Sequence, residues 1–140
     1  MSESSALTLM DMEASIEHMS RGTVRHVDAL LVVVEPYYRA LETAGRIVPL
    51  ARGLGIPRIY GIANKLRTPR DEEAVRAYCQ NHELELIATI PFDENVVEAD
   101  RTGRAIIDYD VTSPIVEELS RVAGLLQQKI PASGGGAGGT

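Results

Sequence analysis

Acidic side chains gather directly after a short apolar run near the amino terminus. The apolar stretch 7–10 is followed by Asp11, Glu13, Glu17 and His18. This pattern predicts a strand that is followed directly by acidic residues. In a parallel α/β fold, ligands bind beyond the carboxyl ends of the strands, where a carboxylate can hold a hydrated Mg²⁺ and nearby acids or an imidazole can orient a water. The alternative is that Asp11 caps the next helix and the other acids are solvated.

Strand and helix patterns alternate through the rest of the chain. Continuous apolar runs, typical of strands buried on both faces of a parallel sheet, occur at 29–35, 57–63 and 84–90. Apolar residues at helical spacing occur at 41–55, 68–82 and 114–126. Pro49 should kink the first of these helices, and Thr68 with Asp71 three residues later predicts the start of the second. The order predicts an α/β fold, in which a parallel sheet is flanked by helices. Asp11, Glu35-Pro36, Asn64 and Pro91 should then all emerge at the carboxyl edge of this sheet.

The length of 140 residues suits one domain, which we place at residues 1–130. No element is assigned to 92–110, apart from a turn at Gly103. The tail 131–140 consists mostly of Gly and Ala and should be disordered, because it cannot bury enough apolar surface.

The composition limits the partners and the compartment. The net charge of −6 excludes general binding to nucleic acids or anionic membranes, because both need a basic surface. The first residues do not resemble a secretion signal and no apolar run approaches eighteen residues, so we expect a cytoplasmic location. A single cysteine, Cys79, excludes an internal disulfide. The three histidines lack the spacing of metal ligands, so they predict no metal site.

Several motifs together resemble a known family. The segment Asp11-Met-Glu-Ala-Ser-Ile-Glu-His18, followed by Arg21-Gly-Thr23, resembles the D-x-E-A-G-x-E-H…R-G-T segment of the MinD/ParA-like P-loop ATPases of the SIMIBI class. Within them it resembles the CooC-type ATPases, which assist nickel insertion into carbon monoxide dehydrogenase. The resemblance continues through Leu30–Pro36, Asn64-Lys65 and Ile90–Asp93, so it covers residues 7 to 128.

The phosphate-binding motif of this family does not occur in the 140 residues. Neither G-x-x-x-x-G-K-[ST] nor the Lys-Gly-Gly variant is found, although such loops supply the amides and the lysine that hold the phosphates. The chain therefore resembles the carboxyl-terminal half of such an ATPase. The Cys-x-Cys pair with which CooC-type proteins bind metal is also not among these residues, so no nickel or zinc site is predicted.

The resemblance implies roles for individual residues. It implies catalytic roles for Asp11, Glu13 and Glu17, with Asp11 holding Mg²⁺ through water once nucleotide is bound. It implies contacts with ATP or ADP for Ser15, Asn64, Lys65, Pro91, Phe92 and Asp93. Ser15 departs from the family, which usually has a glycine whose bare backbone can approach the γ-phosphate. The alternatives are that Asn64-Lys65 forms a turn and that Phe92 fills the core.

Two functions follow from this reading. The first is the carboxyl-terminal portion of a CooC/MinD-like ATPase from a nickel maturation system, inactive without its P-loop. The family's strand order places the P-loop strand between the Asp11 strand and the strand at 30–34, which leaves a gap at the centre of the sheet. Either these two strands close directly on each other or a partner supplies the missing strand. The second is a non-catalytic interaction module on the same scaffold. The expected partners are a second copy, a P-loop-bearing homologue, carbon monoxide dehydrogenase or another metalloenzyme client, but neither nucleic acid nor membrane.

Overall fold

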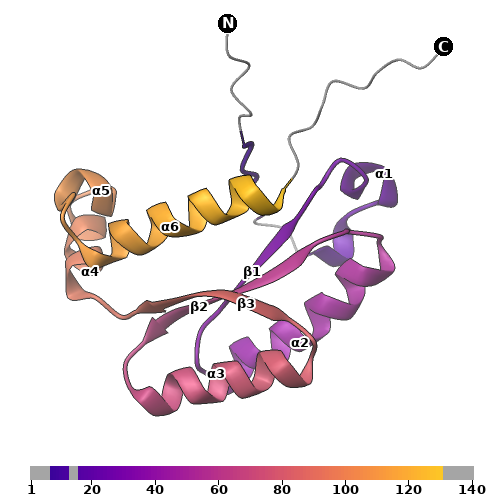
Figure 1. Ribbon diagram of the computed structural model, residues 1–140, viewed down its shortest axis with the longest axis horizontal. Coiled ribbons are helices and arrows are strands. Elements are labelled where there is room, and N and C mark those ends of the chain that lie inside the picture. Colours follow the sequence, from indigo (N-terminus) through magenta and orange to yellow (C-terminus); the bar gives the residue numbers. More distant parts are fainter. Residues whose placement is uncertain (1–6, 13–15, 131–140) are drawn as a thin grey trace, which may run out of the picture.

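A parallel sheet forms the centre of the computed structural model, which describes residues 7–12 and 16–130 (Figure 1). Within these residues the sheet has three strands, in the order β1 (Leu30–Val34), β2 (Ile59–Leu66) and β3 (Glu85–Pro91). Both neighbouring pairs are parallel, with Leu30 beside Ile59 and Tyr60 beside Glu85. The predicted α/β class with a parallel sheet is confirmed.

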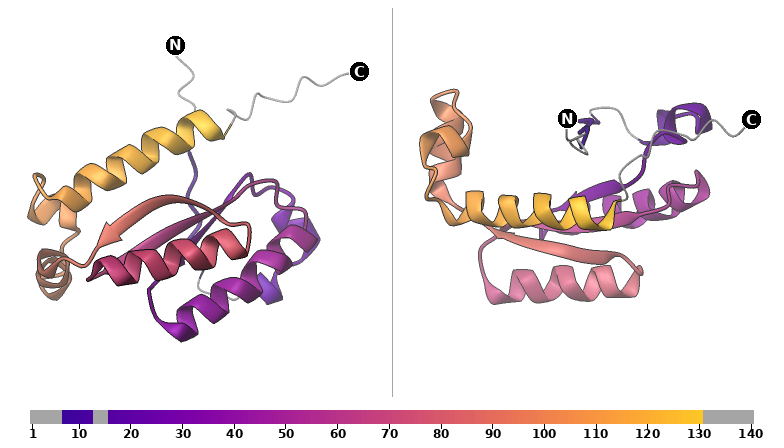
Figure 2. Two further views of the ribbon diagram at one scale, coloured as in Figure 1. Left: turned by 60° about the horizontal axis from the view of Figure 1, so that its bottom comes forward. Right: turned by 45° about the horizontal axis from the view of Figure 1, so that its top comes forward.

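Helices cover both faces of the sheet. In chain order the helical elements are η1 (Ile16–His18), α1 (Arg21–Val24), α2 (Tyr38–Gly53), α3 (Pro69–Asn81), α4 (Glu94–Arg101), α5 (Ile106–Tyr109) and α6 (Pro114–Lys129). α2 and α3 lie on one face and α6 crosses the other (Figures 1 and 2). No helix in the described part of the chain combines the length and apolar character needed to cross a membrane.

Alternation along the strands divides the core between these faces. Val32 and Val34 point toward α2 and α3, where they join an apolar cluster with Val48 and Val75. The opposite face carries a second cluster, whose buried members are Tyr60, Ile62, Ile87, Ala88, Ile90, Ile115, Val122 and Leu126. Because β-branched and aliphatic side chains pack well on a pleated surface, burial on two faces stabilises the sheet in spite of its small size.

The predicted start of α3 is confirmed in detail. The Thr68 hydroxyl accepts a hydrogen bond from the Asp71 N–H, and the Asp71 carboxylate accepts one from the Thr68 N–H. This reciprocal capping satisfies two donors that the helix leaves unpaired. α2 runs without a break through the exposed Pro49, where we expected a kink.

The prediction of a strand near the amino terminus is wrong. Residues 7–12 have no strand conformation, and Leu9 and Met10 are 83% and 61% exposed. A strand needs a neighbouring edge for its N–H and C=O groups, and none of the described strands pairs with this segment.

The chain beyond this segment is anchored at the amino edge of the sheet. A third apolar cluster there has Ile16, Val24, Ala51 and Ile56 as its buried members, with Met12 packed against them. Ala51 lies near the end of α2, and Ile56 lies in the connection between α2 and β2. The acidic segment therefore enters the fold at the edge opposite the one that we predicted.

Two helices occur in the stretch 92–110, to which the sequence assigned none. Asp93 caps α4 by accepting a hydrogen bond from the Asn95 N–H at 2.8 Å. α5 has no buried residue, so no apolar periodicity marks it in the sequence. The turn predicted at Gly103 is confirmed by its φ of 70°. The disorder predicted for 131–140 concerns residues outside those described.

Candidate functional site

A β-bulge shapes the carboxyl end of β2. Ala63 lies beside Thr89 and Leu66 beside Pro91, so three steps along β2 match two steps along β3. Lys65 takes up the extra length in a left-handed conformation with φ of 58°. Bulges of this kind turn side chains away from the regular alternation and are common beside binding sites. Lys65 is exposed and Asn64 half-buried in this bulge.

An ion pair joins the carboxyl ends of β1 and β2. The Lys65 Nζ lies 2.8 Å from a carboxylate oxygen of Glu35, the residue that follows β1. The hydrogen bond to Glu35, together with its negative charge, raises the pKa of Lys65. About half of the Lys65 side chain is exposed, so solvent screens this pair and its contribution to stability is small. Its main effect is to hold the ammonium group beside Glu35, at the end of β1.

Phe92 lies next to the bulge at the end of β3. Its N–H donates a hydrogen bond of 2.8 Å to the Leu66 carbonyl, which extends the ladder between β2 and β3 by one residue. The Arg67 guanidinium carbon lies 3.8 Å from the centre of the Phe92 ring, a cation–π contact. The half-buried ring belongs to neither of the two apolar clusters that flank the sheet.

The loop that carries Arg67 is fixed by the start of α3. The Asp71 carboxylate accepts hydrogen bonds from the Arg67 N–H at 2.9 Å and the Thr68 N–H at 3.1 Å. Asp93 is tied in the same way, since its carboxylate caps α4. The carboxyl edge therefore brings Asn64, Lys65 and Phe92 together in a frame of backbone hydrogen bonds.

Asp11, the first of the predicted acidic residues, is not part of this arrangement. Asp11 is exposed and directly precedes Met12, which packs at the amino edge of the sheet. The expectation that Asp11 emerges beside Asn64 is therefore wrong for this structure, because the strand that would carry it has no neighbour. Glu13 and Ser15 lie outside the described residues, and Glu17 lies in η1.

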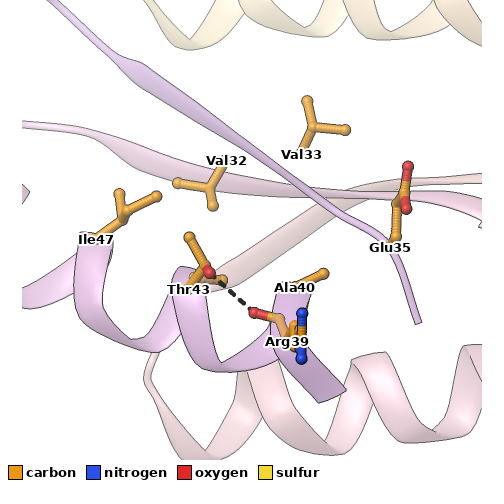
Figure 3. Close-up of a pocket in the computed structure, with 8 residues that line it drawn as sticks. Val32, Val33, Glu35, Arg39, Ala40, Thr43 and Ile47 are labelled. Atoms are coloured by element: carbon orange, nitrogen blue, oxygen red, sulfur yellow. Dashed lines mark hydrogen bonds between the residues drawn. The ribbon is translucent and has the colours of Figure 1, made fainter. Parts of the chain in front are cut away.

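A groove runs along the outer edge of β1. It has a volume of about 330 Å³ and is lined by Val32, Val33, Glu35, Arg39, Ala40, Thr43, Ala44 and Ile47. Val32 from β1 and Ile47 from α2 point into the space between the two elements, whereas Val33 points away from α2 (Figure 3). β1 pairs only with β2, so within the described residues its other edge offers a row of backbone donors and acceptors.

Sequence reasoning missed the part of this groove that belongs to α2. In the sequence, Arg39 and Thr43 are polar residues four positions apart, as on the solvated face of a helix. In the structure the Thr43 hydroxyl donates a hydrogen bond of 2.8 Å to the Arg39 carbonyl, a common local contact within a helix. The sequence did carry one signal for this groove. The five consecutive apolar residues of β1 are typical of a strand that has neighbouring strands on both sides, whereas β1 pairs on one side only within the described residues.

Comparison with known proteins shows which proteins this chain resembles. No protein family model matches it. It is 41% identical over 128 residues to the carbon monoxide dehydrogenase accessory protein CooC of Rhodospirillum rubrum, which covers 90% of the chain and 47% of CooC. It is 34% identical over 117 residues to an uncharacterized ATP-binding protein of Methanocaldococcus jannaschii, covering 83% of the chain and 44% of that protein. The chain thus spans about half the length of the curated relatives it matches.

Two solved structures share the fold. A ParA family ATPase from Chlorobium tepidum superposes with a TM-score of 0.65 at 23% identity, over 78% of this chain and 46% of that one. The cell division protein MinD from Aquifex aeolicus superposes with a TM-score of 0.58 at 21% identity, over 69% of this chain and 44% of that one. Over the part that it covers, the chain is therefore related to CooC and has the fold of the MinD/ParA-like ATPases.

Proposed function

We propose that this chain supplies the base-binding half of the nucleotide site of a CooC-type ATPase. The observation that carries the proposal is the bulge at the end of β2, which holds Asn64 and Lys65 beside Phe92. An Asn side chain offers both a donor and an acceptor to the edge of an adenine. The Phe92 ring, with the backbone of Pro91 and Asp93 on either side of it, offers a surface against which a base can pack.

Phosphate binding requires groups that the 140 residues do not include. Catalysis of phosphoryl transfer depends on positioning and on charge stabilisation, for which P-loop ATPases use backbone amides, a lysine and Mg²⁺. In our proposal a P-loop segment, from the same or another polypeptide, pairs with the free edge of β1. Residues 7–11 then form a strand beside it and bring Asp11, with Glu13 and Glu17, to the phosphates and Mg²⁺.

The cellular role follows from the relative with the highest identity reported above. CooC of Rhodospirillum rubrum is a carbon monoxide dehydrogenase accessory protein. We propose that this chain acts in the maturation of a nickel metallocentre, with carbon monoxide dehydrogenase or another metalloenzyme as the client. In this role it associates with a P-loop-bearing homologue or with a second copy of itself, and its cofactors are ATP or ADP and Mg²⁺.

Reconstitution of the missing half tests the proposal. The amino-terminal segment of Rhodospirillum rubrum CooC that precedes the region matched here would be fused to this chain, and ATP hydrolysis would be measured with Mg²⁺. We expect no hydrolysis by the 140 residues alone and clear turnover by the fusion. Asp11→Ala should abolish turnover, whereas Asn64→Ala should mainly raise the KM for ATP, because it removes binding to the base.

Matched variants distinguish these effects from misfolding. Asp28→Ala, which changes another exposed acid outside the proposed site, should leave turnover unchanged. Ser15→Gly should raise turnover if the segment needs a bare backbone beside the γ-phosphate. A fusion that is folded and binds ATP, but hydrolyses it equally with Asp11 and with Asp11→Ala, would contradict the ATPase proposal.

Within the described residues the outer edge of β1 is unpaired, which also favours a second candidate function, a non-catalytic interaction module. Unpaired edges of this kind accept a strand from another protein. Under this function the chain would bind a full-length homologue or a client enzyme through β1, and the fusion above would assemble without gaining hydrolysis. The turnover of the fusion therefore decides between the two candidates.

A further inference from the structure

Exposed apolar side chains gather at one end of the molecule, apart from the β1 edge. Between residues 96 and 119 six large apolar side chains are at least about one-third exposed, namely Val96, Val97, Ile107, Tyr109, Val111 and Leu119. They belong to α4, to α5 and the turn after it, and to the first half of α6. We call this the α4–α6 surface. A soluble protein rarely concentrates exposed apolar side chains in this way unless they bind something.

The elements of this surface touch one another. α5 packs against both α4 and α6. α4 and α5 lie at one end of the molecule, from which α6 runs back across the sheet (Figures 1 and 2). Arg104, in the loop between α4 and α5, donates a hydrogen bond to the Asp108 carbonyl, and its guanidinium carbon lies 5.8 Å from the centre of the Tyr109 ring. α5 itself has no buried residue, so the core does not account for its apolar side chains.

The same region accounts for most of the net negative charge of the chain. Residues 93–121 contain eight acidic and three basic side chains, which is −5 of the total of −6. Two of the three arginines are already paired, Arg101 with Glu98 and Arg121 with Glu118, each at 2.7 Å. The surface is therefore both apolar and acidic.

We infer that the α4–α6 surface binds a protein segment that is both basic and aliphatic, such as an amphipathic helix with lysines or arginines along one side. Its apolar side chains would cover Ile107, Val111 and their neighbours, and its cations would approach the surrounding carboxylates. The charge excludes nucleic acid and anionic membrane, and it disfavours a second copy of this chain, since like surfaces would repel. The inference stands independently of nucleotide binding.

A peptide of defined chemistry tests this inference. A fluorescently labelled 14-residue helical peptide of leucine and lysine would be titrated with the chain, and binding measured by anisotropy at low and physiological ionic strength. We expect binding that weakens with salt, as a charged contact should. Ile107→Ser combined with Val111→Ser should weaken it about tenfold or more, and so should Glu94→Gln combined with Asp108→Asn.

Matched pairs elsewhere on the chain serve as controls. Leu9→Ser with Leu50→Ser removes two exposed apolar side chains, and Glu42→Gln with Glu73→Gln removes two exposed acids on α2 and α3. Both controls should leave the affinity within about twofold. The inference fails if the peptide does not bind, if the controls weaken binding as much as the surface variants, or if the chain binds phosphatidylglycerol vesicles instead. A dimer of the chain that Ile107→Ser disrupts would also overturn it.

Discussion

The carboxyl edge of the sheet is held in place by contacts with other described residues, whereas the segment 7–12 forms no strand. At the carboxyl edge, backbone hydrogen bonds and a cation–π contact hold Lys65 and Phe92 in place. The segment 7–12 is also mostly apolar, yet it forms no strand, and its side chains Leu9 and Met10 are exposed. Both stretches belong to the resemblance to the same family.

The difference follows from the need of a strand for neighbours. β2 is paired on both sides, so its bulge and the residues around it are fixed by the ladders to β1 and β3. The segment 7–12 pairs with none of the described strands, although the outer edge of β1 is open within these residues, so apolar character alone does not make it a strand. We conclude that the carboxyl edge, which we propose binds the base, is pre-formed, and we propose that the acidic side forms only with a further strand.

The largest effect should come from the aromatic side chain of the carboxyl edge. Phe92→Ala removes a half-buried ring and its contact with Arg67, so it should lower the free energy of unfolding by about 2 kcal/mol. The matched control Leu9→Ala should change it by less than about 0.5 kcal/mol, because Leu9 is exposed. Urea unfolding of both variants measures this. An equal loss of stability in the two variants would contradict the difference that we describe between the carboxyl edge and the segment 7–12.

A smaller effect should come from the helix layer that supports β1 and β2. A Cβ at Gly45 in α2 would collide with the hydroxyl of Tyr78, whose ring is stacked on His82 with centroids 4.0 Å apart. Gly45→Ala should therefore lower the free energy of unfolding by about 1 kcal/mol, although alanine favours the helix. Gly124→Ala in α6, which meets nothing within 4 Å, should instead raise it by about 0.5 kcal/mol. If both variants were stabilising, α2 and α3 would not be closely packed.

The smallest effect should come from the ion pair beside the bulge. Glu35→Gln removes the partner that raises the pKa of Lys65, so this pKa should fall toward its ordinary value in an NMR titration of the Lys65 side chain. A raised lysine pKa stabilises the folded state below the unfolded-state pKa of about 10.4, and this contribution disappears as the pH rises through the folded-state value. The difference in stability between the wild type and Glu35→Gln should therefore vanish in strong alkali. An unchanged Lys65 pKa would show that the pair does not form in solution.

The sequence predicted those features that depend on local pattern. The three strands, the helices on their faces and the capping of α3 by Thr68 and Asp71 all follow from periodicity and cap chemistry. The prediction failed where structure depends on distant partners or on weak signals. The strand at 7–10 needs a neighbouring edge, and α5 has no buried face to reveal it. The bulge at Lys65 and the stacking of Arg67 on Phe92 arise from pairing with β3, which no local pattern reports.

Hydrogen exchange of the backbone amides tests the central claim most directly. It would be followed in the 140-residue chain and in the chain bound or fused to the amino-terminal segment of CooC from Rhodospirillum rubrum. We predict that amides of β2 and β3 are protected in both, and that amides of residues 8–11 exchange freely in the chain alone and at least about tenfold more slowly with the added segment. Protection of residues 8–11 in the chain alone, or free exchange there in a complex that hydrolyses ATP, would contradict the account.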